Sequence, residues 1–312
     1  MKLAVVGAGG VGGYFGARLA AAGHDVTFVA RGEHLRAIRQ DGLRVESIKG
    51  DVHVRPARAT DRPDEIGPVD AVLCAVKAWQ LPSALRAMPP LLGKDGVVLP
   101  LQNGVEAVDE ARKALGRERV LGGAAWIRAE IAAPGLIRHS GIEPRIVLGE
   151  PDGGESNRAR DLAAVLRGAG VDAEATADIV AVLWSKLVFI AATSAVGAAV
   201  RVPVDVFRAL GETRALLVAA MEETIAVARA RGVALAPELL DRTLAFVDSL
   251  PAGTTSSMQR DVMAGRPSEL DAQCGAVVRL GREARVPTPV NDVLYAVLLP
   301  QERAARQAAG VA

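Results

Sequence analysis

Residues 3–12 read LAVVGAGGVG, a short apolar run followed at once by glycines in the spacing GxGxxG. The run has the composition of a buried strand, and the residues after it have the pattern of a helix. In this context the first glycine permits a tight turn, the second lets the backbone approach a pyrophosphate, and the third lets helix and strand pack closely. The stretch predicts a dinucleotide site at the helix N-terminus. Its expected contacts are Gly7, Ala8, Gly9, Gly10, Val11 and Gly12.

The pattern on either side of this stretch sets the fold class. In the first third of the chain, β-rich runs such as DVTFVA and DAVLCAVK alternate with helical patterns, which predicts a parallel, doubly wound sheet. A looser β-type stretch and a polar, glycine-rich connector follow, and beyond them almost every segment has a helical period. We therefore predict an α/β protein, with a Rossmann-type parallel-sheet domain at residues 1–172 and an all-helical domain at residues 173–312.

Composition argues against several classes of protein. Lys and Arg number 37 against 36 Asp and Glu, and aromatic residues make up 3%, which argues against a nucleic-acid surface. Cys74 and Cys274 lie in no CxxC pair, so we expect core thiols, no metal site and no disulfide. The N-terminal apolar run is too short for a secretory signal, which favours a cytoplasmic protein.

One stretch, Ile179 to Val200, is long enough to cross a membrane. Lys186 lies well inside it and no cluster of positive residues flanks it, so we expect no membrane span. The apolar character of the helical half favours instead the burial of helices against one another. It also suggests a homodimer, because such helices often expose more apolar surface than one domain can cover.

The end of the second predicted strand bears on the choice of dinucleotide. An NAD site places a carboxylate there for the ribose hydroxyls, whereas this chain has Ala30, Arg31 and Gly32. An arginine without an acid suits a 2′-phosphate, so the expected cofactor is NADP(H). Two alternatives stay open: Arg31 is one of many surface arginines, and Glu33 lies close enough in sequence to offset its charge.

Two polar residues follow other predicted strands, at the edge where open α/β sheets bind ligands. Lys77 lies in AVKAWQ and Asn103 in PLQNG, in a chain with only six lysines and three asparagines. Both are candidates for the site. A solvated lysine and an ordinary Asn-Gly turn remain the simpler interpretations.

Residues 183–194 read LWSKLVFIAATS, with Lys186 in the middle of an apolar run. In a helix Lys186, Ile190 and Ser194 lie on one face. A buried ammonium needs a partner or a chemical role, and Glu269 in the downstream stretch RPSELD is the natural carboxylate. The alternative for Glu269 is a first-turn acid that opens a helix.

Five separated motifs together resemble the ketopantoate reductase (2-dehydropantoate 2-reductase) family along nearly the whole chain: GAGGVGG, VKAWQ, LQNGVE, LWSKLVFIAA and SSMQRDVMAGRPSELD. The resemblance implies an NADPH-dependent enzyme that reduces a 2-oxo acid to the 2-hydroxy acid. It implies that Lys186 protonates the carbonyl oxygen and that Asn103 contacts nicotinamide and substrate. Lys77 and Glu269 would help to hold the cofactor, and Ser257 would bind near the substrate carboxylate.

The chain departs from that family where the substrate is held. Members that act on ketopantoate carry asparagines one and two turns after the lysine and again about ten residues later. This chain has Ile190, Ser194 and, by spacing, Val204. Loss of hydrogen-bonding groups weakens selection for a substrate hydroxyl. A reductase of a different carbonyl compound and a non-catalytic NADP(H)-binding protein therefore stay open as alternatives.

Overall fold

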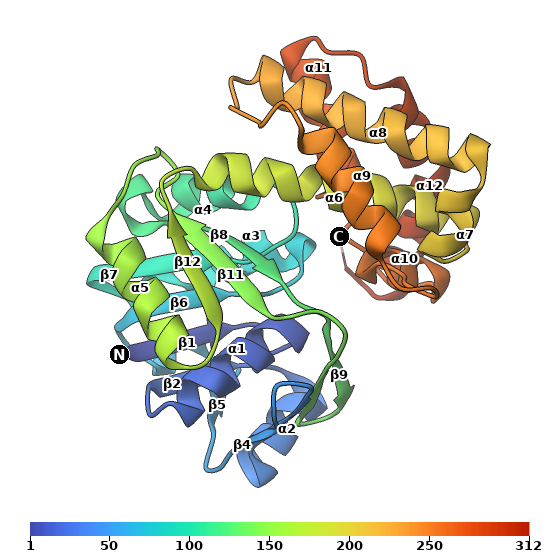
Figure 1. Cartoon of the computed structure of the whole chain (residues 1–312). Coiled ribbons are helices and arrows are strands. Elements are labelled where there is room, and N and C mark those ends of the chain that lie inside the picture. The colour runs from blue at the N-terminus through green and yellow to red at the C-terminus, as the bar shows by residue number, and fades with distance from the viewer. Residues whose placement is uncertain (312) are drawn as a thin grey trace. The chain divides into compact units, whose positions relative to one another are not determined.

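The computed structural model describes residues 1–311, which form two compact units (Figure 1). The first comprises Met1–Gln102 and Ala107–Ile179, and the second comprises Asn103–Glu106 and the chain from Val180 onward. The sequence placed the boundary after residue 172. The contacts place it at Ile179, because the strand β12 (Asp172–Thr176) still pairs within the first unit.

A five-stranded parallel sheet in the order β5-β2-β1-β6-β7 forms the centre of the first unit. Its strands are β1 (Lys2–Val6), β2 (Asp25–Val29), β5 (Arg58–Thr60), β6 (Val69–Cys74) and β7 (Leu92–Pro100). The helices of this unit are α1 (Gly10–Ala21), α2 (Gly32–Asp41), α3 (Leu81–Ala87), α4 (Ala107–Leu115) and α5 (Asn157–Gly168). The predicted doubly wound parallel sheet is thus confirmed.

Two smaller sheets complete this unit. One has the order β4-β3-β10-β9, with β3 (Leu43–Ser47), β4 (Val52–Val54), β9 (Ala129–Ala133) and β10 (Leu136–His139). The other has the order β12-β11-β8, with β8 (Gly122–Trp126), β11 (Arg145–Gly149) and β12. Strands β9 and β12 have the sequences AEIAA and DAEAT, which carry no clear strand signal, so they were not predicted.

The second unit is helical among the described residues, as predicted. Its helices are α6 (Ile179–Val200), α7 (Val204–Ala209), α8 (Gly211–Ala230), α9 (Leu239–Ser249), α10 (Ser257–Met263), α11 (Cys274–Ala284) and α12 (Pro289–Ala308). Helix α6 is apolar on all sides and long enough to cross a membrane, yet 67% of its most apolar window is buried inside the chain. That burial is typical of a core helix.

The prediction that Glu269 opens a helix is wrong. Helix α11 begins at Cys274, and Glu269 lies in the turn before it, where its carbonyl accepts a hydrogen bond from the Gln273 backbone N–H at 3.0 Å. Side-chain contacts at Ser268 and Asp271 hold this turn. Tertiary contacts therefore override the local capping pattern.

Candidate active site

The glycine turn after β1 admits no side chain at two of its positions. Gly7 has a φ of +96°, and a Cβ there would lie 2.7 Å from the Val76 backbone nitrogen. A Cβ on Gly12 would lie 2.1 Å from the Gly7 carbonyl oxygen. Both distances are far below a van der Waals contact, so these glycines are fixed by the packing of the turn against α1 and the β6 edge.

Gly9 differs from its neighbours, because a Cβ there would meet nothing within 4 Å. Gly9 is also the N-cap of α1, and no side chain caps this helix. The N-terminus of α1 thus has open space beside Gly9 and no side chain that caps it. Such a cradle suits a pyrophosphate.

The other predicted contacts lie around this space. The Ala8 backbone N–H donates to the Val29 carbonyl at 3.1 Å, which fixes the turn to the end of β2. A Cβ on Gly10 would overlap the Ala129 carbonyl oxygen, and Val11 is half-buried. The residues of GxGxxG therefore form one structural unit, and their contact with a dinucleotide phosphate stays a prediction.

His34 is a residue that the sequence pattern did not single out. Its Nε2 lies 2.8 Å from the Ala8 carbonyl oxygen, and its Nδ1 accepts a hydrogen bond from the Gly135 backbone N–H at 3.0 Å. The ring is therefore neutral, with the proton on Nε2. Desolvation lowers its pKa, against the raising effect of the Ala8 hydrogen bond. The first contact joins α2 to the glycine turn and the second joins it to the turn between β9 and β10, and no sequence motif could have revealed pairings this remote.

Arg31 lies at the carboxyl end of β2, where it is the exposed N-cap of α2. The neighbouring acid, Glu33, has its carboxylate 3.4 Å from Arg36 Nη2, and both side chains are largely exposed. Glu33 is thus directed to Arg36, which removes the main objection to an anion contact at Arg31.

Lys77 follows β6 at the same carboxyl edge of the sheet. Its backbone N–H donates to Gln80 Oε1 at 3.2 Å, and its ammonium lies 5.7 Å from the centre of the Trp79 ring. Gln102 Nε2 donates to the Val76 carbonyl and the Cys74 carbonyl, each at 3.0 Å. Gln102 thereby ties the ends of β6 and β7 together and fixes the backbone that carries Lys77.

In the helical unit, three of the predicted residues meet. Lys186 Nζ donates to Asn103 Oδ1 at 2.9 Å, and Asn103 Nδ2 donates to Glu269 Oε2 at 2.8 Å. Lys186 and Glu269 are 9% and 5% exposed. The amide orientation of Asn103 is the one that satisfies both neighbours, because the opposite orientation would set its NH₂ group against an ammonium. Asn103 therefore bridges a buried cation and a buried anion.

Burial lowers the pKa of Lys186 from 10.5 to about 8, and the nearby Glu269 carboxylate acts in the opposite direction. Desolvation disfavours the charged amine, whereas an opposite charge favours it. The side chain is thus mostly protonated near neutral pH but is a much better proton donor than an exposed lysine. This property suits a general acid.

Gly104 explains why an Asn-Gly pair stands at this place. Its φ is +107°, and a Cβ there would lie 2.4 Å from the Ala272 carbonyl oxygen. Within the helical unit the Asn103–Glu106 segment thus passes directly over the turn that carries Glu269. The positive φ of Gly104 supports the turn interpretation of the Asn-Gly pair, and the site role of Asn103 stays a prediction.

The remaining predicted residues occupy different environments. Ile190 is half-buried and packs against a cluster that includes Trp184 and Leu187, and Ser194 is buried on the same helix. Ser257 is exposed at the start of α10, where the preceding Ser256 provides the helix cap. Proximity to Lys186 is thus observed for Asn103 and Glu269, while a substrate contact by Ser257 stays a prediction.

Other chemistry finds no support in the described part of the chain. Cys74 and Cys274 are buried free thiols, as predicted, and burial raises the pKa of Cys74 to about 11. Residues 1–311 contain no group of three or more His, Cys, Asp or Glu side chains that could hold a metal ion. Neither thiolate nor bound-metal chemistry is suggested by these groups.

Comparison with known proteins gives consistent matches. Residues 3–153 match the family model described as ketopantoate reductase PanE/ApbA, and residues 178–302 match its C-terminal counterpart. A 2-dehydropantoate 2-reductase of Mesorhizobium japonicum is 36% identical, covering 96% of this chain and 97% of its own. The uncharacterized oxidoreductase YkpB of Bacillus subtilis is 31% identical, covering 96% and 98%.

A solved structure agrees with these matches. The PanE/ApbA family ketopantoate reductase from Ralstonia eutropha is 35% identical and has a TM-score of 0.90. The alignment covers 98% of this chain and 100% of that one. The similarity thus extends over both units of the chain.

Proposed function

Since the chain belongs to the ketopantoate reductase family, whose named members are oxidoreductases, we propose that it reduces a 2-oxo acid to the 2-hydroxy acid with NADPH. The observation that carries this proposal is the buried Lys186 ammonium. It lies 2.9 Å from Asn103 Oδ1, and the side-chain NH₂ of Asn103 donates a hydrogen bond to Glu269. A soluble metabolic reductase needs a proton donor at the carbonyl oxygen, and this group has the required environment.

A nicotinamide cofactor follows from the family, and the glycine turn fits it. The open space at Gly9 and the uncapped first turn of α1 would receive the pyrophosphate. When bound, the reduced nicotinamide supplies the hydride. Preference for NADPH over NADH is supported by Arg31, which stands where an NAD site carries an acid.

In the proposed reaction Lys186 provides the proton. Hydride addition to the carbonyl carbon pushes the C=O π electrons onto oxygen, and this oxygen takes a proton from the Lys186 ammonium. The products are the 2-hydroxy acid, the oxidised cofactor and a neutral amine that regains a proton from water. Asn103 holds the ammonium in place, and the Glu269 carboxylate favours its charged state.

The substrate is proposed to be more apolar than ketopantoate. Ile190 lies one turn after Lys186 where family members that act on ketopantoate carry an amide, and it packs against apolar side chains. A site without that amide loses its means of selecting a substrate hydroxyl, so alkyl and aryl 2-oxo acids are the favoured candidates. We propose that polar contacts to substrate or cofactor also come from Ser194, Ser257 and Lys77.

A substrate panel tests this function. The protein is incubated with NADPH or NADH and with ketopantoate or a series of alkyl and aryl 2-oxo acids, while nicotinamide absorbance is followed. We expect oxidation of NADPH and a higher kcat/KM for the apolar acids. A clear preference for ketopantoate would overturn the substrate assignment. If NADPH binds but no carbonyl compound oxidises it, the chain is a non-catalytic NADP(H)-binding protein and the enzymatic proposal fails.

A further inference from the structure

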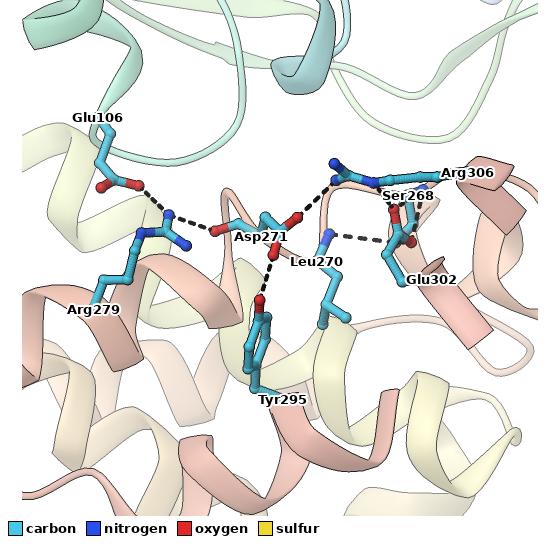
Figure 2. Close-up of polar contacts among 8 residues, drawn as sticks. All are labelled: Glu106, Ser268, Leu270, Asp271, Arg279, Tyr295, Glu302 and Arg306. Atoms are coloured by element: carbon cyan, nitrogen blue, oxygen red, sulfur yellow. Dashed lines mark hydrogen bonds and ion pairs between the residues drawn. The ribbon is translucent and has the colours of Figure 1, made fainter. Parts of the chain in front are cut away.

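The turn at Ser268–Asp271, which carries Glu269, is held on both sides by buried or half-buried polar groups of the helical unit (Figure 2). Glu269 itself faces Asn103, so this turn determines where the charge partner of Lys186 lies. The residues that hold the turn come from α11 and α12 and touch neither Lys186 nor Asn103 in the hydrogen bonds described above. They are therefore candidates for a positioning role.

Glu302 makes the most concentrated set of these contacts. Its carboxylate accepts hydrogen bonds from the Ser268 backbone N–H at 3.0 and 3.1 Å, from Ser268 Oγ at 2.5 Å and from Arg306 Nε at 2.7 Å. The residue is 2% exposed. Every donor of Ser268 thus converges on one carboxylate of α12, as Figure 2 shows.

The other end of the turn is fixed separately. Tyr295 Oη donates to Asp271 Oδ1 at 2.5 Å, and Arg306 Nη2 lies 2.9 Å from Asp271 Oδ2. Arg279 Nη2 donates to the Asp271 carbonyl at 2.8 Å and to Glu106 Oε2 at 2.5 Å. Arg279 therefore links this turn to the segment that carries Asn103, and the two partners of Lys186 are held by one connected network.

Stability alone gives little reason for this arrangement. Removing a carboxylate from water is costly, and buried ion pairs are often replaced by apolar residues with no loss of stability. Their best attested use is to specify one conformation among several. This turn lies outside the regular helices and must hold a buried acid 2.8 Å from an amide, so it is a place where one conformation matters.

We propose that Glu302 is a positioning residue, which holds Ser268 so that the carboxylate of Glu269 stays at Asn103 and in reach of the field of Lys186. Its catalytic consequence rests on the function proposed above. The physical claim is separate: without Glu302 the turn relaxes, Glu269 moves away, and Lys186 loses the group that favours its charged form.

The pKa of Lys186 is the readout that separates this role from simple support of the fold. Burial lowers this pKa and the Glu269 carboxylate raises it, so loss of Glu269 with burial and the Asn103 contact unchanged lowers it further. The chain has six lysines, which makes the ¹³Cε signals of lysine-labelled protein few enough to assign with a Lys186→Arg variant. Their titration by NMR requires no catalytic activity.

The test variant is Glu302→Gln, which keeps the size of the side chain but replaces one acceptor oxygen by an NH₂ donor. The amide keeps one acceptor oxygen and can donate to Ser268 Oγ, but it carries no charge and cannot accept all the hydrogen bonds that the carboxylate accepts, so the contact with Ser268 is weakened. Glu283→Gln is the matched control, because Glu283 pairs with Arg231 on exposed surface at 3.0 Å, away from the turn. Ser268→Ala is the second variant, since it removes the hydroxyl that donates to Glu302 and accepts from the Leu270 backbone N–H at 3.3 Å, and it leaves the Glu302 carboxylate in place.

We expect the Lys186 pKa to fall in Glu302→Gln and to stay at its wild-type value in Glu283→Gln. We also expect kcat to fall about 10-fold to 100-fold, as for a misplaced catalytic group. A folded Glu302→Gln protein with an unchanged Lys186 pKa overturns the proposal. If Glu302→Gln does not fold, the same measurement is made on Ser268→Ala, in which the Lys186 pKa should fall and an unchanged Lys186 pKa would overturn the proposal. If the wild type reduces no carbonyl compound while the pKa falls, the proposed function fails and the positioning role stands.

Discussion

The glycine turn of the sheet unit and the Lys186 group of the helical unit are built on opposite principles. The glycine turn lies within the six consecutive positions 7–12 and depends on glycines, which have no side chain. An added Cβ at Gly7 or Gly12 would overlap backbone atoms. The Lys186 group consists of three side chains that are far apart in the sequence. Lys186 lies 83 positions from Asn103, and Asn103 lies 166 positions from Glu269. A local sequence motif is enough to form the glycine turn, whereas a lysine with a shifted pKa requires residues that only the tertiary fold brings together.

The largest effect is expected on the Lys186 side of this comparison. Lys186→Ala removes the proton donor, so kcat should fall by about 10²–10⁴-fold while NADPH affinity is retained. Steady-state kinetics and equilibrium binding measure the two quantities. Lys113→Ala, at an exposed position of α4, is the control. Near-normal turnover in Lys186→Ala would remove this residue from the mechanism.

The glycine turn should separate binding from folding. Gly9→Val introduces a side chain into open space, so we expect the Tm to stay unchanged. We expect the affinity for NADPH to fall by about 10-fold or more, because the new side chain blocks the approach of the pyrophosphate. Gly12→Ala should instead lower Tm, because its Cβ would overlap the Gly7 carbonyl. Thermal unfolding and NADPH titration of both variants are the measurements. Equal loss of Tm in the two would mean that Gly9 serves packing alone.

Arg31 should give the smallest effect, one confined to the choice of cofactor. Arg31→Ala removes an exposed positive charge, and we expect NADPH affinity to fall by about 10-fold with little change for NADH. Arg36→Ala, at the partner of Glu33, is the control. Parallel losses for NADPH and NADH would show that Arg31 does not contact the 2′-phosphate.

The sequence predicted the elements whose signals are local. The glycine turn, the apolar helix around Lys186 and four strands of the central sheet (β1, β2, β6 and β7) follow from runs and spacings within a few residues. The contact of His34 with Gly135 and that of Ser268 with Glu302 span 101 and 34 positions, and no periodicity encodes them. The turn at Glu269, where a helix was predicted, is also held by residues far away in the sequence, so the local pattern did not reveal it. The cytoplasmic location and the homodimer stay predictions.

The lowered pKa of Lys186 also has a consequence for stability. Its folded-state pKa is lowered to about 8, below the ordinary 10.5, so the unfolded chain holds this proton more tightly. The cost of burying the charge is therefore present in full below about pH 8 and is relieved as the pH rises toward 10.5. Activity and the contribution of Lys186 to stability should change in opposite directions over that window.

The pH dependence of kcat/KM for the carbonyl substrate tests the central claim most directly, because it reports the pKa of the essential acid in the enzyme form that binds this substrate, which is the NADPH complex. With a saturating level of NADPH and the best substrate of the panel, we expect a plateau at neutral pH and a tenfold fall per pH unit above about 8, as Lys186 loses its proton. A profile that stays flat well above that pH, in protein shown to remain folded, would contradict the assignment of Lys186 as the proton donor.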